Sequence, residues 1–316
     1  MKAAVVNTFG KAPTYADFAE PEAGAEETVV TVEAAALSPI VKLLASGRHY
    51  TSGTQAGFAP GVDGVGRDSE GRRVYFLFPK APFGAMAERS VAQRAMTVPV
   101  PDALASDEAA AIVTAALASW VALSRRARIQ PGESVLVLGA TGASGGMALQ
   151  TARHLGASRV VAVGRNRAKL DRLDADAKIA LDDDADAQLR TEFDRGIDIV
   201  LDFVWGNPAG RVLRAATRER GSRSGEPRLR YIQIGTIAGD EIALRGDMFR
   251  STGLELLGSG IGSVAVAELV AGAAELLAAA PGAGFTTPFQ SVPLHDIGAA
   301  WSGDPDTRYV VMPERR

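Results

Sequence analysis

The stretch Ser134-Val-Leu-Val-Leu-Gly-Ala-Thr-Gly-Ala-Ser-Gly-Gly-Met147 decides how this chain is organised. Its apolar run, Val135 to Leu138, is typical of a buried strand and stops at Gly139. An A-x-G-x-x-G pattern follows, formed by Ala140, Gly142 and Gly145. From about Ser144 to Leu155, apolar residues recur at turn spacing, which predicts a helix. The stretch therefore predicts a strand, a tight glycine turn and a helix in direct succession.

This succession is the context in which the glycine pattern indicates dinucleotide binding. Glycine lets the chain turn sharply and lets its backbone approach a pyrophosphate, while the helix N-terminus offers N–H groups and partial positive charge. A glycine-rich turn that binds nothing is the alternative, but the flanking strand and helix favour cofactor binding. The predicted contacts are Ala140, Thr141, Gly142, Ala143, Ser144 and Gly145.

Further strand-like segments follow at regular spacing, separated by apolar helical or loop segments. They are Arg159–Val163, Lys178–Leu181, Ile197–Val204, Leu229–Ile234 and Leu254–Gly258. With Val135–Leu138 they make six strands in alternation, which predicts an α/β fold with a parallel, doubly wound sheet.

The chain before this region is strand-like and rich in turns. Two β-rich segments, Gly61–Gly66 and Arg72–Phe78, flank a turn and predict a hairpin. Two helices are expected next, one starting near Asp107 and running towards Thr114, the other from Leu117 to about Arg126.

After the predicted sheet comes an alanine-rich helix, Ala265–Ala279, and then two strands, Thr286–Val292 and Arg308–Met312. These last strands suggest that the chain returns to its first domain. The expected division is a β-rich domain over residues 1–117, a dinucleotide-binding domain over 118–262, and a return over 263–316.

Composition narrows the functional classes. The 316 residues are 47% hydrophobic and 22% charged, and the net charge of −3 gives no electrostatic case for nucleic acid or an anionic membrane. The absence of cysteine excludes disulfides and thiolate chemistry, and it suits a cytoplasmic protein. The three histidines share no metal-binding spacing, so no metal site is expected. Charges or glycines interrupt the apolar stretches, so no membrane span is expected either.

The ordering of these segments resembles the medium-chain dehydrogenase/reductase superfamily, and within it the zinc-free quinone oxidoreductase branch. The likeness covers nearly the whole chain and is strongest over Pro131–Gly145. Three shorter elements also match, with some substitutions: Gly61-Val-Asp63, Gly71-Arg-Arg-Val74 and Gly84-Ala-Met-Ala-Glu88. The resemblance implies a six-stranded Rossmann cofactor domain and a β-rich, GroES-like catalytic domain. It also implies a homodimer, formed through the sheet edge near Leu254–Gly258.

Departures from the family pattern bear on the mechanism. In zinc-dependent relatives the positions of Ser38 and Val62 carry Cys and His, so the resemblance implies that Lewis-acid alcohol chemistry is absent here. The quinone oxidoreductase branch often has Asn and Asp where this chain has Ser38 and Val41. Because of those substitutions, the resemblance does not indicate which polar groups contact the substrate.

The end of the second predicted strand indicates which nicotinamide cofactor is used. An enzyme specific for NAD favours a carboxylate here, whereas this chain has Gly164, Arg165 and Arg167. Arginine suits the 2′-phosphate of NADPH, so NADPH is the predicted cofactor. The alternative is that these arginines merely project into water. Arg308 lies where relatives carry a basic residue close to the cofactor.

Other cofactor contacts are expected where strands four to six end, because ligands of open sheets bind outside the carboxyl ends of the strands. The resemblance and this rule together select Phe203, Gly235, Thr236, Gly258 and Ser259. Trp205 is expected to line the substrate pocket, although tryptophan is more often packed in a core.

The chemistry implied by the resemblance is hydride transfer from NADPH to a quinone or an α,β-unsaturated carbonyl. Candidate proton donors or polarising groups are Tyr50, Ser38 and Lys42, with His49 in the substrate pocket. An ordinary half-buried aromatic remains the alternative for Tyr50. The competing function is an NADPH-binding sensor that kept the fold and lost turnover. The acceptor is expected in a cleft between the two domains.

Overall fold

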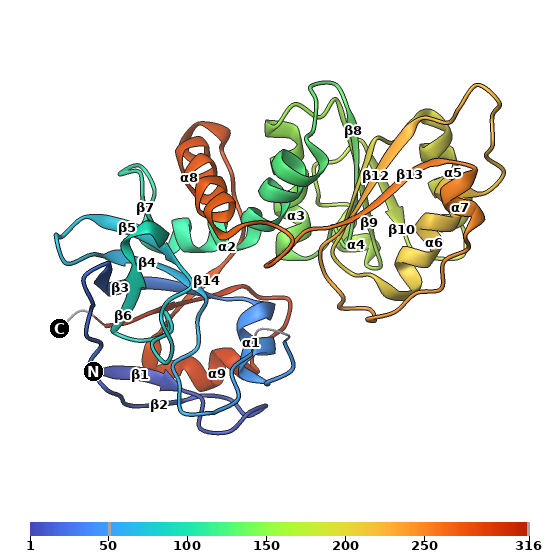
Figure 1. Ribbon diagram of the computed structural model, residues 1–316. Coiled ribbons are helices and arrows are strands. Elements are labelled where there is room, and N and C mark those ends of the chain that lie inside the picture. The colour runs from blue at the N-terminus through green and yellow to red at the C-terminus, as the bar shows by residue number, and fades with distance from the viewer. Residues whose placement is uncertain (50–51, 315–316) are drawn as a thin grey trace. The chain divides into compact units, whose positions relative to one another are not determined.

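The computed structural model describes residues 1–49 and 52–314. The chain forms two compact units, the first made of Met1–Ala115 and Val270–Arg316 and the second of Ala116–Leu269 (Figure 1). The chain enters the second unit two residues before the expected boundary at 117/118. It leaves that unit at Leu269, later than the expected boundary at 262/263 and already inside helix α8 (Val266–Ala283).

The second unit contains a six-stranded sheet in the order β10-β9-β8-β11-β12-β13. All five neighbouring pairs in this sheet are parallel. Its strands are β8 (Ser134–Leu138), β9 (Arg159–Gly164), β10 (Ala177–Ala180), β11 (Ile199–Asp202), β12 (Arg228–Gln233) and β13 (Gly253–Gly258). The predicted doubly wound sheet is confirmed, with the order reversing between β8 and β11.

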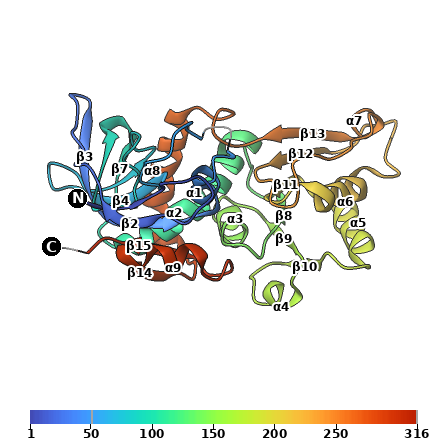
Figure 2. The ribbon, with the colours of Figure 1, turned by 90° about the horizontal axis from the view of Figure 1, so that it is seen from below.

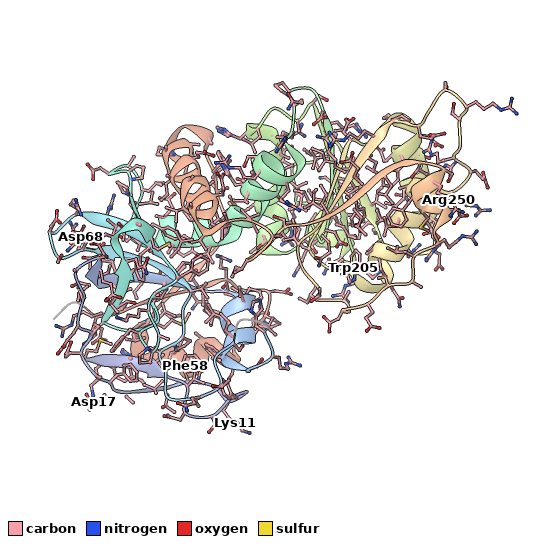
Figure 3. The ribbon with its side chains drawn as sticks, viewed as in Figure 1. Lys11, Asp17, Phe58, Asp68, Trp205 and Arg250 are labelled. Atoms are coloured by element: carbon pink, nitrogen blue, oxygen red, sulfur yellow. The ribbon has the colours of Figure 1, made fainter. Side chains whose placement is uncertain are left out.

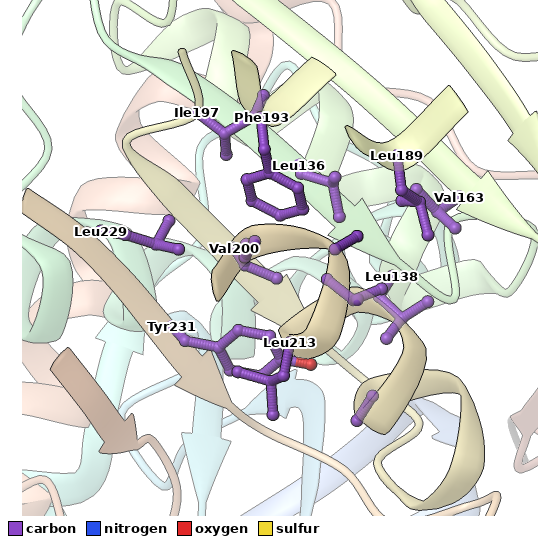
Figure 4. Packing of buried hydrophobic residues seen from close by; sticks show 14 of the residues in the cluster. Leu136, Leu138, Val163, Leu189, Phe193, Ile197, Val200, Leu213, Leu229 and Tyr231 are labelled. Atoms are coloured by element: carbon purple, nitrogen blue, oxygen red, sulfur yellow. The ribbon is translucent and has the colours of Figure 1, made fainter. Parts of the chain in front are cut away.

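Helices cover both faces of this sheet. Helix α3 (Ala143–His154) packs on one face, and α5 (Ala185–Arg195) and α6 (Gly206–Thr217) pack on the other (Figures 1 and 2). Because side chains alternate along a strand, Val135 and Val137 join the cluster under α3, and Leu136 and Leu138 join the cluster under α5 and α6 (Figure 4). Short helices α4 (Arg167–Leu170) and α7 (Asp247–Arg250) complete the unit.

The first unit is built on a seven-stranded sheet in the order β14-β15-β3-β4-β5-β7, with β6 also paired to β3. Its strands are β3 (Glu27–Leu37), β4 (Asp63–Arg67), β5 (Arg73–Leu77), β6 (Arg89–Gln93), β7 (Thr97–Pro99), β14 (Gln290–Pro293) and β15 (Tyr309–Met312). A separate hairpin pairs β1 (Lys2–Val5) with β2 (Thr14–Asp17). The predicted β4–β5 hairpin is confirmed, and β15 pairs with β3, so the chain does return to its first unit.

The helices that carry residues of the first unit are α1 (Pro39–Ala45), α2 (Ser106–Val121), α8 and α9 (Ile297–Ser302). Two expectations for this part were wrong. The two helices predicted between Asp107 and Arg126 are one helix, α2, which continues into a π-helical turn, η2 (Ala122–Ala127), because no Gly or Pro interrupts it. The strand predicted over Thr286–Val292 begins only at Gln290, as β14, because Pro288 lacks a donor for the ladder, and it ends one residue later than predicted.

Two described helices, Ser106–Ala127 and Val266–Ala283, are long and apolar enough to cross a membrane by length and composition alone. Because buried core helices pass the same test, the expectation that the chain has no membrane span stays a prediction. In the apolar window of the first helix, 67% of the residues are buried inside the protein, as in the core helix of a globular domain.

Candidate functional site

The glycine turn after β8 is packed against its own helix. Gly139 adopts φ 92°, and the N–H groups of Gly139 and Ala140 donate to the carbonyl of Val163, at 2.9 and 3.0 Å. Helix α3 begins at Ala143, with Gly142 as its N-cap. A Cβ on Gly145 would overlap the carbonyl oxygen of Gly139 and lie 2.7 Å from Ala140 Cα. Only glycine therefore lets the first turn of α3 pack on the loop.

This arrangement leaves the N-terminus of a twelve-residue helix at the carboxyl end of the central strand. The first N–H groups of a helix have no acceptor within it, so they and the helix dipole favour an anion there. The residues predicted to bind the cofactor here, Ala140 to Gly145, all lie in the turn or in the first helical turn.

At the end of β9 the chain passes close to the glycine turn. A Cβ on Gly164 would lie 3.0 Å from Thr141 Cγ2, so a side chain at 164 would press on the turn. Arg165 is exposed and makes no hydrogen bond or ion pair with the described residues. Arg167 instead pairs with Asp182 at 3.0 Å, and both side chains are about half exposed. The two predicted phosphate donors therefore differ, because one is free and the other is engaged.

The turn after β11 is held by a buried carboxylate. Asp202 is fully buried, and its Oδ1 accepts the N–H groups of Val204 and Trp205 at 2.8 and 2.9 Å. Its Oδ2 accepts the hydroxyl of Tyr231 at 2.8 Å. Burial raises the pKa of the Asp202 carboxyl. Asp202 and the residue that follows it, Phe203, thus end β11 in a fixed turn.

Trp205 caps α6 in this turn and adopts φ 55° (labelled in Figure 3). Its ring lies edge-on to Tyr231, with 6.4 Å between the centroids, and packs against the cluster under α5 and α6. Within the second unit the side chain therefore has a packing role, which was the alternative to the predicted role in the substrate pocket.

The ends of β12 and β13 lie along the same edge of the sheet. A Cβ on Gly235 would lie 2.5 Å from the carbonyl oxygen of Phe203, so glycine allows the two turns to approach. Thr236 follows, and Ile237 is 81% exposed. At β13, no atom lies within 4 Å of a Cβ placed on Gly258, so the space beside this residue is open.

Some backbone groups predicted to contact the cofactor at β13 already have partners in the protein. The N–H of Ser259 donates to the carbonyl of Gln233 at 2.9 Å, and the carbonyl of Gly258 accepts Arg126 Nε at 2.7 Å. The arginine contact spans 132 positions of sequence, and no local pattern around Arg126 indicates it.

In the first unit, the predicted catalytic residues surround α1. Ser38 is the N-cap, but its hydroxyl makes no capping bond, and its Oγ is buried without a partner. Lys42 Nζ donates to the carbonyl of Trp301 at 2.8 Å, and burial lowers the pKa of its ammonium. Burial also lowers the pKa of His49. Tyr50 lies outside the described residues.

The same unit contains a buried polar cluster that consists of Asp63, Tyr75, Thr114 and Arg308. The hydroxyls of Tyr75 and Thr114 lie 2.5 and 2.8 Å from Asp63 Oδ2, while Asp63 Oδ1 has no partner. Burial raises the pKa of the Asp63 carboxyl, with Arg308 opposing that shift. Tyr75 on β5 lies opposite Val65 on β4, and Asp63 lies two residues before Val65 on the same strand. Because side chains alternate along a strand, Asp63 and Tyr75 point to the same face of the sheet.

Arg308 was predicted to contact the cofactor, and the structure places it just before β15, only 8% exposed. Burial lowers the pKa of its guanidinium, and the nearby Asp63 raises it. Its Nε and Nη2 are buried without partners, and together they form the edge of the guanidinium that suits a bidentate oxyanion. No described carboxylate forms an ion pair with this guanidinium, although the charge of Asp63 acts on it.

Over residues 1–49 and 52–314 no three His, Asp or Glu side chains are grouped as a metal site. A hollow of about 450 Å³ in the first unit is lined by Glu33, Arg67, Arg73 and Ser106, among others. Its charged groups neutralise one another, with Arg67 paired to Glu33 at 3.1 Å, and it contains none of the predicted site residues.

Comparison with known proteins gives relatives that match over the full chain. The "Probable NADPH-dependent quinone reductase tdiC" of Emericella nidulans is 29% identical, and the alignment covers 99% of this chain and all of that protein. The crystallised quinone oxidoreductase of Thermus thermophilus, whose complex with NADPH was also solved, is 29% identical. It superposes with a TM-score of 0.82 over 99% of this chain and 100% of its own.

A mycobacterial quinone oxidoreductase, 22% identical, superposes with a TM-score of 0.83 over 99% of this chain and 100% of its own, and this likeness concerns the fold. No family model matches the chain.

Proposed function

Because the chain belongs to the medium-chain dehydrogenase/reductase superfamily, we propose that it is an NADPH-dependent oxidoreductase that reduces quinones or α,β-unsaturated carbonyls without a metal. The observation that carries the proposal is the glycine turn at the point where the sheet order reverses, with the N-terminus of α3 facing outward at the strand ends. The experiment that tests it is NADPH oxidation followed at 340 nm with a panel of quinones and enones. Cofactor binding without turnover on any acceptor would favour the sensor function instead.

In the second unit, the residues at the carboxyl ends of successive strands of the sheet would hold successive parts of the cofactor. The N–H groups at the start of α3 would bind the pyrophosphate, and Arg165 would pair with the 2′-phosphate. The turns that begin at Phe203, Gly235 and Gly258 would support the other half. When bound, NADPH supplies a hydride, and the acceptor takes one proton as well. A quinone or enone delocalises the arriving charge, so solvent or one hydroxyl suffices as the proton source.

We propose that the polar residues of the first unit act on the acceptor, but Ser38 and Lys42 differ in how available their side chains are. Ser38 has an unused hydroxyl, whereas the ammonium of Lys42 already binds the carbonyl of Trp301, which favours a structural role for Lys42. Tyr50, His49 and Trp205 remain proposals. A homodimer also stays a prediction, and β13 is the edge strand through which the sheet could extend.

Replacing Arg165 with Ala should weaken NADPH binding about 10- to 100-fold and leave NADH binding nearly unchanged, because one charge-assisted contact to the 2′-phosphate is lost. Dissociation constants from fluorescence titration would measure both. Arg167→Ala is the matched control, since its guanidinium is already paired with Asp182, and a smaller loss is expected. Equal losses for the two cofactors, or tighter binding of NADH by the unaltered protein, would contradict this assignment.

Chelation should have no effect on turnover, because the chain has no cysteine and carries Ser38 and Val62 at the positions of the zinc ligands in relatives. Elemental analysis of the purified protein should find no stoichiometric zinc, and a strong chelator should leave the rate of NADPH oxidation unchanged. One metal ion per chain, with activity lost on chelation and restored by that metal, would overturn the metal-free mechanism.

A further inference from the structure

The sheet order separates the two halves of a dinucleotide in the second unit. The glycine turn ends β8, and Gly164 and Arg165 end β9 on one side of it, where the 2′-phosphate is proposed to bind. The other half of the cofactor, with the nicotinamide, must therefore extend over β11, β12 and β13 on the opposite side. This placement rests on the proposed function.

The end of β13 is shaped as a fixed turn with open space beside it. Gly258 has nothing within 4 Å of its missing Cβ, and Ser259 is tied to β12 through the carbonyl of Gln233. The next turn closes on itself, because Gly260 N–H donates to Ser263 Oγ at 2.8 Å and the Gly260 carbonyl accepts the N–H of Ser263 at 3.2 Å. A ligand seated beside Gly258 would therefore meet a defined backbone.

One short helical turn holds both ends of the connection from β13 to α8. Arg126, in the π-helical turn η2, donates from Nε to the Gly258 carbonyl at 2.7 Å. Its neighbour Arg125 pairs with Glu268 near the start of α8, with 2.6 Å between Nε and Oε2. Hydrogen bonds from a charged donor are shorter and stronger than neutral ones, so the contact of Arg126 fixes the orientation of the Gly258 peptide.

We infer that Arg126 is a positioning residue that sets where the nicotinamide end of NADPH seats beside Gly258. It does not touch the reacting atoms. By occupying one side of the Gly258 carbonyl, it holds this peptide plane in one orientation and thereby fixes the backbone that borders the open space beside Gly258. Arginine is required because Nε is a donor set back within the side chain, whereas the single ammonium of lysine lies at its tip.

The test compares a complete cofactor with a fragment that lacks the nicotinamide. Arg126→Gln should weaken NADPH binding about 10-fold or more, the loss expected for one hydrogen bond from a charged group, while 2′,5′-ADP binds within about twofold of the unaltered protein. Arg126→Lys keeps the charge and should recover part of the NADPH affinity. If the glutamine variant fails to fold, Arg126→Lys replaces it in the test, because it should still weaken NADPH binding more than 2′,5′-ADP binding.

Arg228→Gln is the matched control. Its guanidinium also contacts β13, but through the side chain of Glu255 at 2.8 Å and away from Gly258, so both affinities should be unchanged. Equal weakening of NADPH and 2′,5′-ADP in Arg126→Gln, or no weakening of either, would overturn the role of Arg126. If the unaltered protein binds neither ligand, the proposed function itself fails.

Discussion

Replacing Gly145 with Val should reduce NADPH affinity at least about 100-fold and destabilise the second unit by roughly 1–3 kcal/mol or more. Even the first atom of the new side chain would overlap the Gly139 carbonyl and crowd Ala140 Cα at 2.7 Å. These are backbone atoms of the turn itself, so no side-chain rotation can relieve the overlap. Helix α3 would have to move away from the turn and take its N-terminal N–H groups out of reach of a phosphate.

Gly146→Ala is the matched control, one position further along the same helix. There a Cβ would meet only the carbonyl oxygen of Ala140, at 3.8 Å, which is an ordinary contact. This variant should therefore bind NADPH normally. Alanine in a helix interior is favoured over glycine by about 0.5–1 kcal/mol, so the variant should unfold at a denaturant concentration equal to or higher than that of the unaltered protein. Titration with NADPH and equilibrium unfolding would measure both variants. Normal cofactor binding by Gly145→Val would show that the turn is not the binding site.

The parts of the structure that were predictable from sequence are those set by local periodicity and by glycine chemistry. Val135–Leu138, the A-x-G-x-x-G pattern and the regular spacing of later strands were enough to predict the parallel sheet, because apolar runs and tight turns depend on nearby residues. The break expected near Leu117 was wrong for a related reason. Alanine has the highest helix propensity, and no Gly or Pro separates the two predicted segments, so local propensity favours one continuous helix there.

Contacts between distant residues were not predictable, since no local pattern marks them. The bond from Arg126 to Gly258 and the approach of Arg308 to Asp63 join segments that only the folded chain brings together. The packing of Trp205 on Tyr231 likewise depends on the neighbouring strand. Asp202 carried a partial signal, because a carboxylate that ends a buried apolar strand must find hydrogen-bond donors at once.

The buried cluster of Asp63, Tyr75, Thr114 and Arg308 leads to the other large expected effect. Its two charged members are both buried, and each opposes the pKa shift that burial causes in the other. A buried charge without an opposite charge or a full set of hydrogen bonds is costly, whereas removing both charges together is often nearly neutral. The cluster therefore predicts strong coupling between the two positions.

Asp63→Leu should lower the free energy of unfolding by about 2–4 kcal/mol, because it leaves the buried Tyr75 hydroxyl without its acceptor and removes the opposite charge that acts on the guanidinium of Arg308. Arg308→Met should also destabilise the protein, since it leaves the carboxylate buried alone. The double variant should lose clearly less than the sum of the two single losses, as determined by equilibrium unfolding in a double-mutant cycle. Additive losses would mean that the two charges do not stabilise each other. In that case the buried guanidinium of Arg308 would be stabilised by groups other than Asp63.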